Sequence, residues 1–159
     1  MTQVDRFLLI SCVLCRVSCV PENNIMVQVE LAKIIIDEKN HEQAVVLREK
    51  GGPRQFPIVI GFVEASSIQM KVAGVDAPRP LTHDLFAAAI LSLGARAELL
   101  VIDDLQEGTF YAKLKLWDKA GQPVILDCRP SDGISLAIRL DIPMFIEDKV
   151  FNKAVSGDI

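Results

Sequence analysis

The sequence predicts a single α+β domain with a mixed, mainly antiparallel sheet and three to four packed helices. Stretches of alternating apolar residues, which are typical of strands, come in groups, and segments with helical spacing separate these groups. Half of the 159 residues are hydrophobic and 24% are charged, a composition that favours a compact core over a disordered tail. Because a chain of this length fills about one domain, we place a single fold at residues 26–155.

The first half of this domain is predicted to contain three antiparallel strands and two helices. The strand segments are 27–36, 41–48 and 56–60. A helical pattern begins at residue 63 and ends at Gly74. After a loop made stiff by two prolines, Thr82 is the predicted N-cap of a second helix, which ends at Gly94.

The second half is predicted to contain a long hairpin, further strands and the remaining helices. The strand segments are 96–102, 109–117 and 124–128, of which the first two pair around a polar turn. Ser131 is the predicted N-cap of a helix over residues 132–139. Pro143 then precedes a last short strand and a terminal helical turn.

Residues 1–25 form an apolar segment that contains Cys12, Cys15 and Cys19, and we expect it to lie outside the fold. The cysteines alone do not complete a zinc site, which needs four ligands. The apolar run resembles a short signal peptide, but its positive region is weak and it is too short to span a bilayer. We interpret it as an extension upstream of a start at Met26, and we expect a cytoplasmic protein without stable membrane insertion.

The charge of the chain argues against tight, purely electrostatic binding of nucleic acid. The net charge is -4 and the pI is near 5.2, whereas proteins that hold nucleic acid in this way are usually basic over one face. Lys113, Lys115 and Lys119 gather locally, but acidic residues lie close by in sequence. We interpret these lysines as a solvated strand face.

The familiar catalytic signatures are missing from the sequence. It has no G-x-S-x-G elbow, P-loop, H-E-x-x-H pair or dinucleotide-binding glycine motif, so it gives no support to the mechanisms that those motifs carry. Three junctions rich in polar residues remain as candidates: 79–84, 103–111 and 127–132.

The first junction places His83 and Asp84 in the opening turn of the second predicted helix. An imidazole there can act as a general base, and an acidic side chain is stabilised by the helix dipole. The alternative is that Thr82 caps the helix, Asp84 complements the dipole and His83 is only exposed. His83 is the best candidate base, because the second histidine, His41, falls in a predicted turn.

The third junction places Asp127 at a strand end and then Arg129, Ser131 and Asp132 at a helix start. Three interpretations stay open. The backbone N–H groups and the guanidinium can converge on a phosphate, Arg129 can pair with Asp127 or Asp132 to hold the corner, or the two aspartates can hold Mg²⁺. The middle junction contributes the phenol of Tyr111. Glu64 can face the same cleft, although its position at a helix start also suits the dipole.

These junctions resemble the characteristic segments of the bifunctional nuclease family. The matching runs are PRPLTHDL at 78–85, DLQEGTFYA at 104–112 and DCRPSD at 127–132. The similarity covers roughly residues 27–154, which is the whole predicted domain. Two positions depart from the family pattern: Gly133 replaces the usual Ala, at a cost of about 1 kcal/mol in helix propensity, and Val59 replaces a common Trp.

The resemblance implies an α+β domain that degrades RNA and DNA with help from a divalent metal, Mg²⁺ or Mn²⁺, and that forms a homo-oligomer. Within such a nuclease we assign proton transfer and catalysis to His83, Asp84 and Asp132, and the metal to Asp127 and Asp132. The predicted substrate contacts are Arg79, Arg129, Ser131 and Tyr111. The alternative function is a non-catalytic module of the same fold that binds an anion or a partner protein, which the acidic pI favours.

Overall fold

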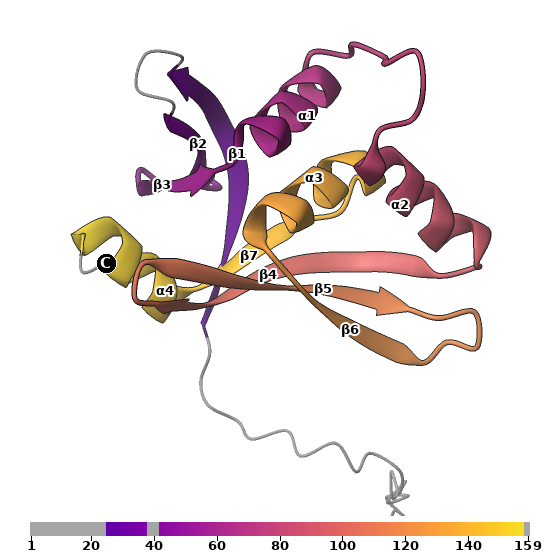
Figure 1. Cartoon of the computed structure of the whole chain (residues 1–159). Helices are drawn as coiled ribbons and strands as arrows, with labels where there is room; N and C mark the ends of the chain where they lie inside the picture. The colour runs from indigo at the N-terminus through magenta and orange to yellow at the C-terminus, as the bar shows by residue number, and fades with distance from the viewer. Residues whose placement is uncertain (1–24, 38–41, 158–159) are drawn as a thin grey trace, which may run out of the picture.

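Figure 1 shows one curved sheet with helices packed against it. The computed structural model describes residues 25–37 and 42–157. Within them the elements are, in chain order, β1 (Met26–Asp37), β2 (Glu42–Glu49), β3 (Gln55–Ile60), α1 (Phe62–Val72), α2 (Thr82–Ser92), β4 (Arg96–Gln106), β5 (Thr109–Trp117), β6 (Pro123–Cys128), α3 (Pro130–Leu140), β7 (Met144–Glu147) and α4 (Asp148–Ser156). The predicted segment 1–25, apart from Ile25, and His41 lie outside the described residues.

The sheet has the strand order β3-β2-β1-β7-β4-β5-β6. All neighbouring pairs are antiparallel except β4 and β7, which are parallel. The predicted α+β class with a mixed, mainly antiparallel sheet is therefore confirmed, as is the meander of the first three strands. The short strand β7 is essential to this topology, because it joins the β1–β3 meander to the β4–β6 meander.

Helix α3 lies between α1 and α2, and all three cover the same side of the sheet (Figure 1). Apolar side chains of α3, including Ile134 and Ala137, are buried in the main core with strand residues such as Leu100 and Ile146. Gly133 is also buried, and a Cβ there would come within 2.4 Å of Leu100. The absence of a side chain at Gly133 therefore leaves space for Leu100 to pack against α3.

The predicted helix ends are correct, but both predicted N-caps are wrong. Gly74 and Gly94 have φ values of +67° and +75°, the left-handed conformation that ends α1 and α2. The N-cap of α2 is Leu81, and Thr82 is already helical. Similarly, Arg129 is the N-cap of α3, since the fixed φ of Pro130 suits the first helical position and moves the helix start ahead of Ser131.

Helix α4 closes the core at the end opposite to α2 (Figure 1). The ring of Phe151 is buried against Phe56, with ring centroids 5.2 Å apart, and Arg54 lies over the same ring. Arg54 also donates hydrogen bonds to Glu49 and Asp148, which fixes the helix to the hairpin of β2 and β3. The predicted terminal helical turn is thus a nine-residue helix with its own buried face.

The far side of the β4–β6 meander carries the predicted lysine face. Ala112 and Leu114 of β5 point into the core. Because side chains alternate along a strand, Lys113 and Lys115 point away from the helices. Lys113 pairs there with Asp103. In the described part of the chain, no helix has the length and apolar character needed to cross a membrane.

Candidate active site

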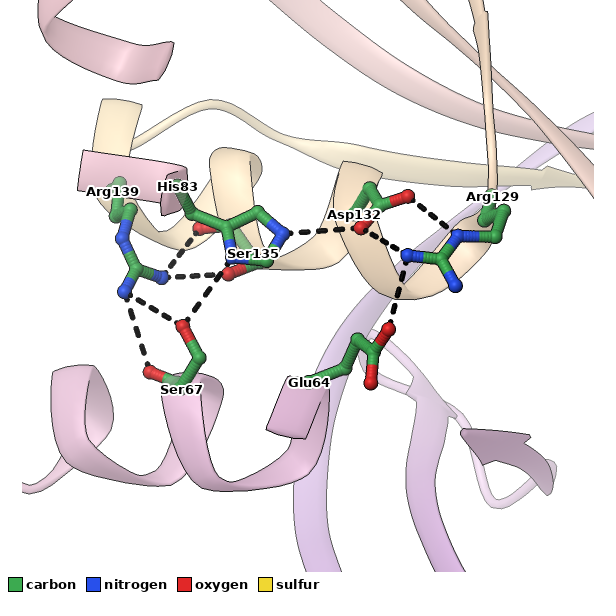
Figure 2. A network of polar contacts seen from close by, with 7 residues as sticks. All are labelled: Glu64, Ser67, His83, Arg129, Asp132, Ser135 and Arg139. Carbon is green, nitrogen blue, oxygen red and sulfur yellow. Dashed lines mark hydrogen bonds and ion pairs between the residues drawn. The ribbon is translucent and has the colours of Figure 1, made fainter. Parts of the chain in front are cut away.

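A line of polar side chains runs along α3, between α1 and α2 (Figure 2). Arg129, Asp132, Ser135 and Arg139 are spaced by three or four residues, so they share one face of the helix. The two arginines stand at opposite ends of this line and bind different partners. The Arg129 end is open to solvent, whereas the Arg139 end is closed.

At the open end, Arg129 binds two carboxylates from different helices. Its Nε and Nη2 donate to Asp132 at 2.8 and 3.0 Å, and Nη2 lies 3.0 Å from Oε1 of Glu64 on α1. The Arg129 side chain is still 67% exposed. The predicted pairing with Asp132 is therefore present, and an exposed guanidinium remains available to a ligand.

Asp132 links this guanidinium to the imidazole of His83. Its Oδ1 lies 3.1 Å from Nε2 of His83, which comes from the first turn of α2. Burial alone raises the pKa of Asp132, but hydrogen bonds from Arg129 and His83 outweigh burial and hold the pKa below its usual range. Asp132 is thus an ionised carboxylate at neutral pH.

The protonation of His83 follows from its two partners. An ionised carboxylate only accepts hydrogen bonds, so Nε2 of His83 carries a proton and donates it to Asp132. On the other side, Nδ1 lies 3.4 Å from the hydroxyl of Ser67, and that hydroxyl oxygen accepts a hydrogen bond from Arg139 at 3.0 Å. The Ser67 proton is then directed at Nδ1, which is the basic nitrogen of the ring.

At the closed end, Arg139 holds three helices together. Its side chain is only 4% exposed and donates to Asp84 of α2 at 2.7 Å, to Ser67 of α1 at 3.0 Å and to Ser135 of α3 at 2.7 Å. A buried guanidinium with this many partners is strongly oriented. It positions Ser67, and through Ser67 it positions His83.

Asp84 belongs to the closed end, in contrast to the predicted proton-transfer role. One oxygen accepts the Arg139 bond, and the other accepts the backbone N–H of Leu81 at 2.9 Å. These hydrogen bonds hold the pKa of Asp84 below its usual range. Asp84 therefore stabilises the start of α2, as in the alternative interpretation, although Leu81 rather than Thr82 is the N-cap and His83 is mostly buried and bonded rather than only exposed.

Two hollows lie beside Arg129 and beside the contact of Ser67 with His83. The larger, of about 450 Å³, lies beside Arg129 and is lined by the end of β3, the β4–β5 hairpin and the start of α3, including Ser131. The second, of about 280 Å³, lies between α1 and α2 and is lined by Ser67, His83 and apolar side chains such as Phe62. The basic nitrogen of His83 and the exposed Arg129 are thus each next to a space that can admit a ligand.

Three of the predicted site residues form no hydrogen bond or ion pair with this cluster in the part of the chain that the structure describes. Leu126 and Cys128 pack against the core, so the side chain of Asp127 between them points to the lysine side of the sheet, although Asp127 also lines a hollow with His83 and Asp132. Tyr111 precedes the buried Ala112 and points the same way. Arg79 is exposed in the loop between α1 and α2 and lines neither of the two hollows.

The predicted metal site does not fit the residues present. Asp127 and Asp132 line one hollow, but strand alternation turns the Asp127 side chain toward Lys113, and the oxygens of Asp132 are bound by Arg129 and His83. Across residues 25–37 and 42–157, no group of three or more His, Cys, Asp or Glu side chains is placed to hold a metal ion. Mg²⁺ and Ca²⁺ require several oxygen ligands, which this pair of aspartates does not supply together.

Cys128 lies close to the cluster without adding reactivity to it. It lines a hollow on the other side of His83, together with Phe86 and Asp132. Burial, and next the charge of Asp132, raise the pKa of its thiol to about 11. The thiol is therefore protonated at neutral pH and a poor nucleophile.

Sequence reasoning missed Ser67, Ser135 and Arg139. A signal for two of them exists, because Asp132, Ser135 and Arg139 continue a polar stripe on a helix whose other faces are apolar. Ser67 has no such signal, since its role depends on how α1 packs against α3.

Comparison with known proteins connects this cluster to a family. The bifunctional nuclease domain matches residues 45–157, more than half of the chain. The chain belongs to this family. The resemblance seen in the three polar junctions is thereby confirmed, and His83, Arg129 and Asp132 all lie within the matched region. An uncharacterized protein of Mycobacterium tuberculosis strain H37Rv is 39% identical over 129 residues, 81% of this chain and 76% of that protein.

Two rice proteins extend the comparison to named nucleases. Bifunctional nuclease 1 of Oryza sativa subsp. indica is 26% identical over 119 residues, which are 72% of this chain and 35% of the rice protein. Bifunctional nuclease 2 of Oryza sativa subsp. japonica is 27% identical over 113 residues, 69% of this chain and 34% of the rice protein. This bifunctional nuclease domain therefore matches about a third of each rice protein.

Proposed function

We propose that this bifunctional nuclease domain hydrolyses the phosphodiester bonds of RNA and DNA at the cluster of His83, Asp132 and Arg129. One observation carries the proposal. An imidazole bonded to an ionised carboxylate stands next to an exposed guanidinium, and this group lies in a domain whose rice relatives are named bifunctional nucleases.

In the proposed reaction, Arg129 binds a phosphate oxygen. Its planar group of N–H donors suits phosphate, and its charge offsets the negative charge that builds up on the phosphoryl oxygens as the P–O bond breaks. The exposure of the side chain supports this role, since the ligand meets it without rearrangement of the helices.

His83 and Asp132 move the proton. Nδ1 can take a proton from an attacking water that displaces the hydroxyl of Ser67, which lies 3.4 Å away. Asp132 then stabilises the imidazolium through Nε2, and the imidazolium returns the proton to the leaving oxygen. Ser67 acts as a positioning residue, because it is buried and held by Arg139. This assignment replaces Asp84 by the His83–Asp132 pair as the proton-transfer group.

The test is cleavage of labelled single-stranded RNA and DNA by the purified chain, with Mg²⁺, Mn²⁺ or EDTA. His83→Ala and Asp132→Asn are expected to lower the rate by about 10²- to 10⁴-fold. Asp76→Asn is the matched control, because it removes a carboxylate from an exposed loop position that lines neither the Arg129 hollow nor the hollows beside His83, and its rate is expected to equal that of the wild type. The EDTA arm tests the predicted metal requirement, which the described side chains by themselves do not support.

Equal cleavage by all four folded proteins would contradict the proposed site. Absence of cleavage by the wild type would instead favour the non-catalytic binding module. One observation supports that second function: Arg129 already occupies both oxygens of Asp132, as in a structural ion pair.

We also propose that the protein is a cytoplasmic homo-oligomer. The observation that supports self-association is that Leu85 and Leu91 of α2, and Leu93 directly after it, are exposed. Contiguous exposed apolar side chains commonly mark protein interfaces. Light scattering after size-exclusion chromatography tests this, and Leu91→Glu is expected to lower the measured mass to that of a monomer.

A further inference from the structure

A third hollow, the Phe86 hollow of about 340 Å³, lies between α2, α3 and the strands β5 and β6. The surface that it exposes is mainly apolar and comes from Phe86, Leu114, Leu126 and Leu136. Leu126 is only half-buried although it packs on the helix side of the sheet, because β6 is an edge strand. Phe86 itself is 46% exposed. A flat apolar ligand can therefore reach an aromatic ring at this edge of the sheet.

The charge of the Phe86 hollow differs from that of the hollow beside Arg129. The ionised Asp132 lines it together with Asp127, and among the described residues no Lys or Arg does. The thiol of Cys128, which also lines it, is protonated at neutral pH because burial raises its pKa to about 11. A carboxylate repels a phosphate but not an uncharged ring. The Phe86 hollow thus suits a neutral, flat group rather than an anion.

Asp132 connects the Phe86 hollow to the proposed phosphate contact. Its carboxylate accepts hydrogen bonds from Arg129 at 2.8 and 3.0 Å, and its partner His83 lines the Phe86 hollow beside it. In a nucleic-acid strand, one sugar separates each phosphate from its base. A phosphate at Arg129 therefore leaves a neighbouring base close to the Phe86 hollow, and the cationic and apolar parts of the site match the two parts of a nucleotide.

We propose that the Phe86 hollow is a nucleobase subsite, in which one base of the bound strand stacks on the ring of Phe86. The proposal rests on the proposed function in one respect, which is that Arg129 is the phosphate contact. Every base has a π face, so stacking on an aromatic side chain tolerates any sequence. The subsite therefore distinguishes a base from the absence of a base much more strongly than it distinguishes one base from another.

The test is equilibrium binding of two single-stranded DNAs of equal length. One carries thymine at every position, and the other has the same phosphates but a tetrahydrofuran abasic unit in place of every nucleotide. Fluorescence anisotropy with the full chain measures both affinities, and a gel verifies that the strands stay intact. The wild type is expected to bind the strand with bases about tenfold more tightly, the order of magnitude that the stacking of one base contributes.

Three variants locate the effect. Phe86→Ala removes the ring and is expected to lose most of the tenfold preference, whereas Phe86→Tyr keeps a ring and is expected to retain it. Phe62→Ala is the matched control, because Phe62 is also an exposed phenylalanine but lines the hollow next to Ser67 instead. Its preference is expected to equal that of the wild type. Light scattering of each variant shows whether self-association has changed.

Equal binding of the two strands by the wild type, or no measurable binding of either, would overturn the proposal. A preference that persists in Phe86→Ala would also overturn it, and a lower mass of that variant would then assign the ring to an interface between copies of the chain. Loss of the preference in Phe62→Ala would place the base in the other hollow and contradict the proposal as well.

Failure of this inference can be told apart from failure of the proposed function, because binding is measured rather than turnover. A chain that prefers the strand with bases but cleaves neither RNA nor DNA would contradict only the proposed function. A chain that cleaves but binds both strands equally would contradict only the nucleobase subsite.

Discussion

Helix α3 carries two arginines in contrasting surroundings. Arg129, at its start, is 67% exposed and binds two carboxylates, whereas Arg139, in its last turn, is 4% exposed and binds groups from three helices. The side chain is the same and the partners are chemically similar. Burial alone separates a guanidinium that can exchange its partners from one that cannot.

The difference shows how a small domain orients the imidazole of His83. The closed end fixes Ser67, and Ser67 fixes one nitrogen of His83. The open end leaves the other side of the cluster within reach of a ligand. Enzymes commonly orient a catalytic base through a second residue that does not itself touch substrate. Variants that remove the contacts of the closed end and of the open end separately therefore test this comparison.

The largest expected effect is the loss of Arg139. In Arg139→Met, Asp84 and the Ser67 hydroxyl lose their buried partner, and we expect the free energy of unfolding to fall by about 3 kcal/mol or more. Urea denaturation measures the change. Arg129→Met is the control on the same helix, and its cost is expected to stay below about 1 kcal/mol because the ion pair is solvated. Equal losses of unfolding free energy in the two variants would show that burial does not distinguish the two arginines.

A smaller effect is expected for Ser67→Ala. The change leaves one Arg139 donor and Nδ1 of His83 without a partner, so we expect a loss of about 1–3 kcal/mol in stability. The looser imidazole should also lower kcat by about tenfold, the equivalent of 1.4 kcal/mol. Ser66→Ala is the matched control, because Ser66 neighbours Ser67 but makes no bond in this cluster. An unchanged kcat in Ser67→Ala would show that Ser67 does not position His83.

The smallest effect is expected in the pH dependence of stability. The folded-state pKa of Asp84 is lowered by its bonds to Arg139 and Leu81, so its contribution is present above the unfolded value of about 4 and is lost as the pH falls through the folded pKa. Asp84→Asn should therefore be less stable than the wild type at pH 7, and this difference should shrink as the pH falls below about 4. Denaturation at several pH values tests the slope, and a constant difference would contradict the assigned pKa direction.

Much of the fold could be predicted from the sequence, because strand alternation and glycine helix ends are local signals. The meander of β1 to β3 and the stops at Gly74 and Gly94 are examples. The pairing of β7 between β1 and β4 could not be predicted, since a four-residue strand has no pattern that specifies its neighbours. The N-cap at Ser131 was wrong because Pro130 moves the start of α3 by its fixed φ.

The candidate site was only partly predictable for a similar reason. Sequence spacing places Arg129 three residues from Asp132, and their bond follows from helix geometry. The approach of His83 to Asp132 across 49 residues depends on the packing of α2 against α3. Strand alternation turns the Asp127 side chain toward Lys113 and away from Asp132, although the two aspartates are close in sequence.

The central claim is that Arg129 binds phosphate while Arg139 holds the helices, and the Nε–H resonances of the arginine side chains test it most directly. The His83→Ala protein, which is expected to leave the strand intact, is titrated with a 5′-phosphorylated single-stranded oligonucleotide. We predict that the Arg129 resonance shifts as the strand binds and that the Arg139 resonance stays in place. Binding that leaves Arg129 unmoved, or that shifts Arg139 instead, would contradict the account.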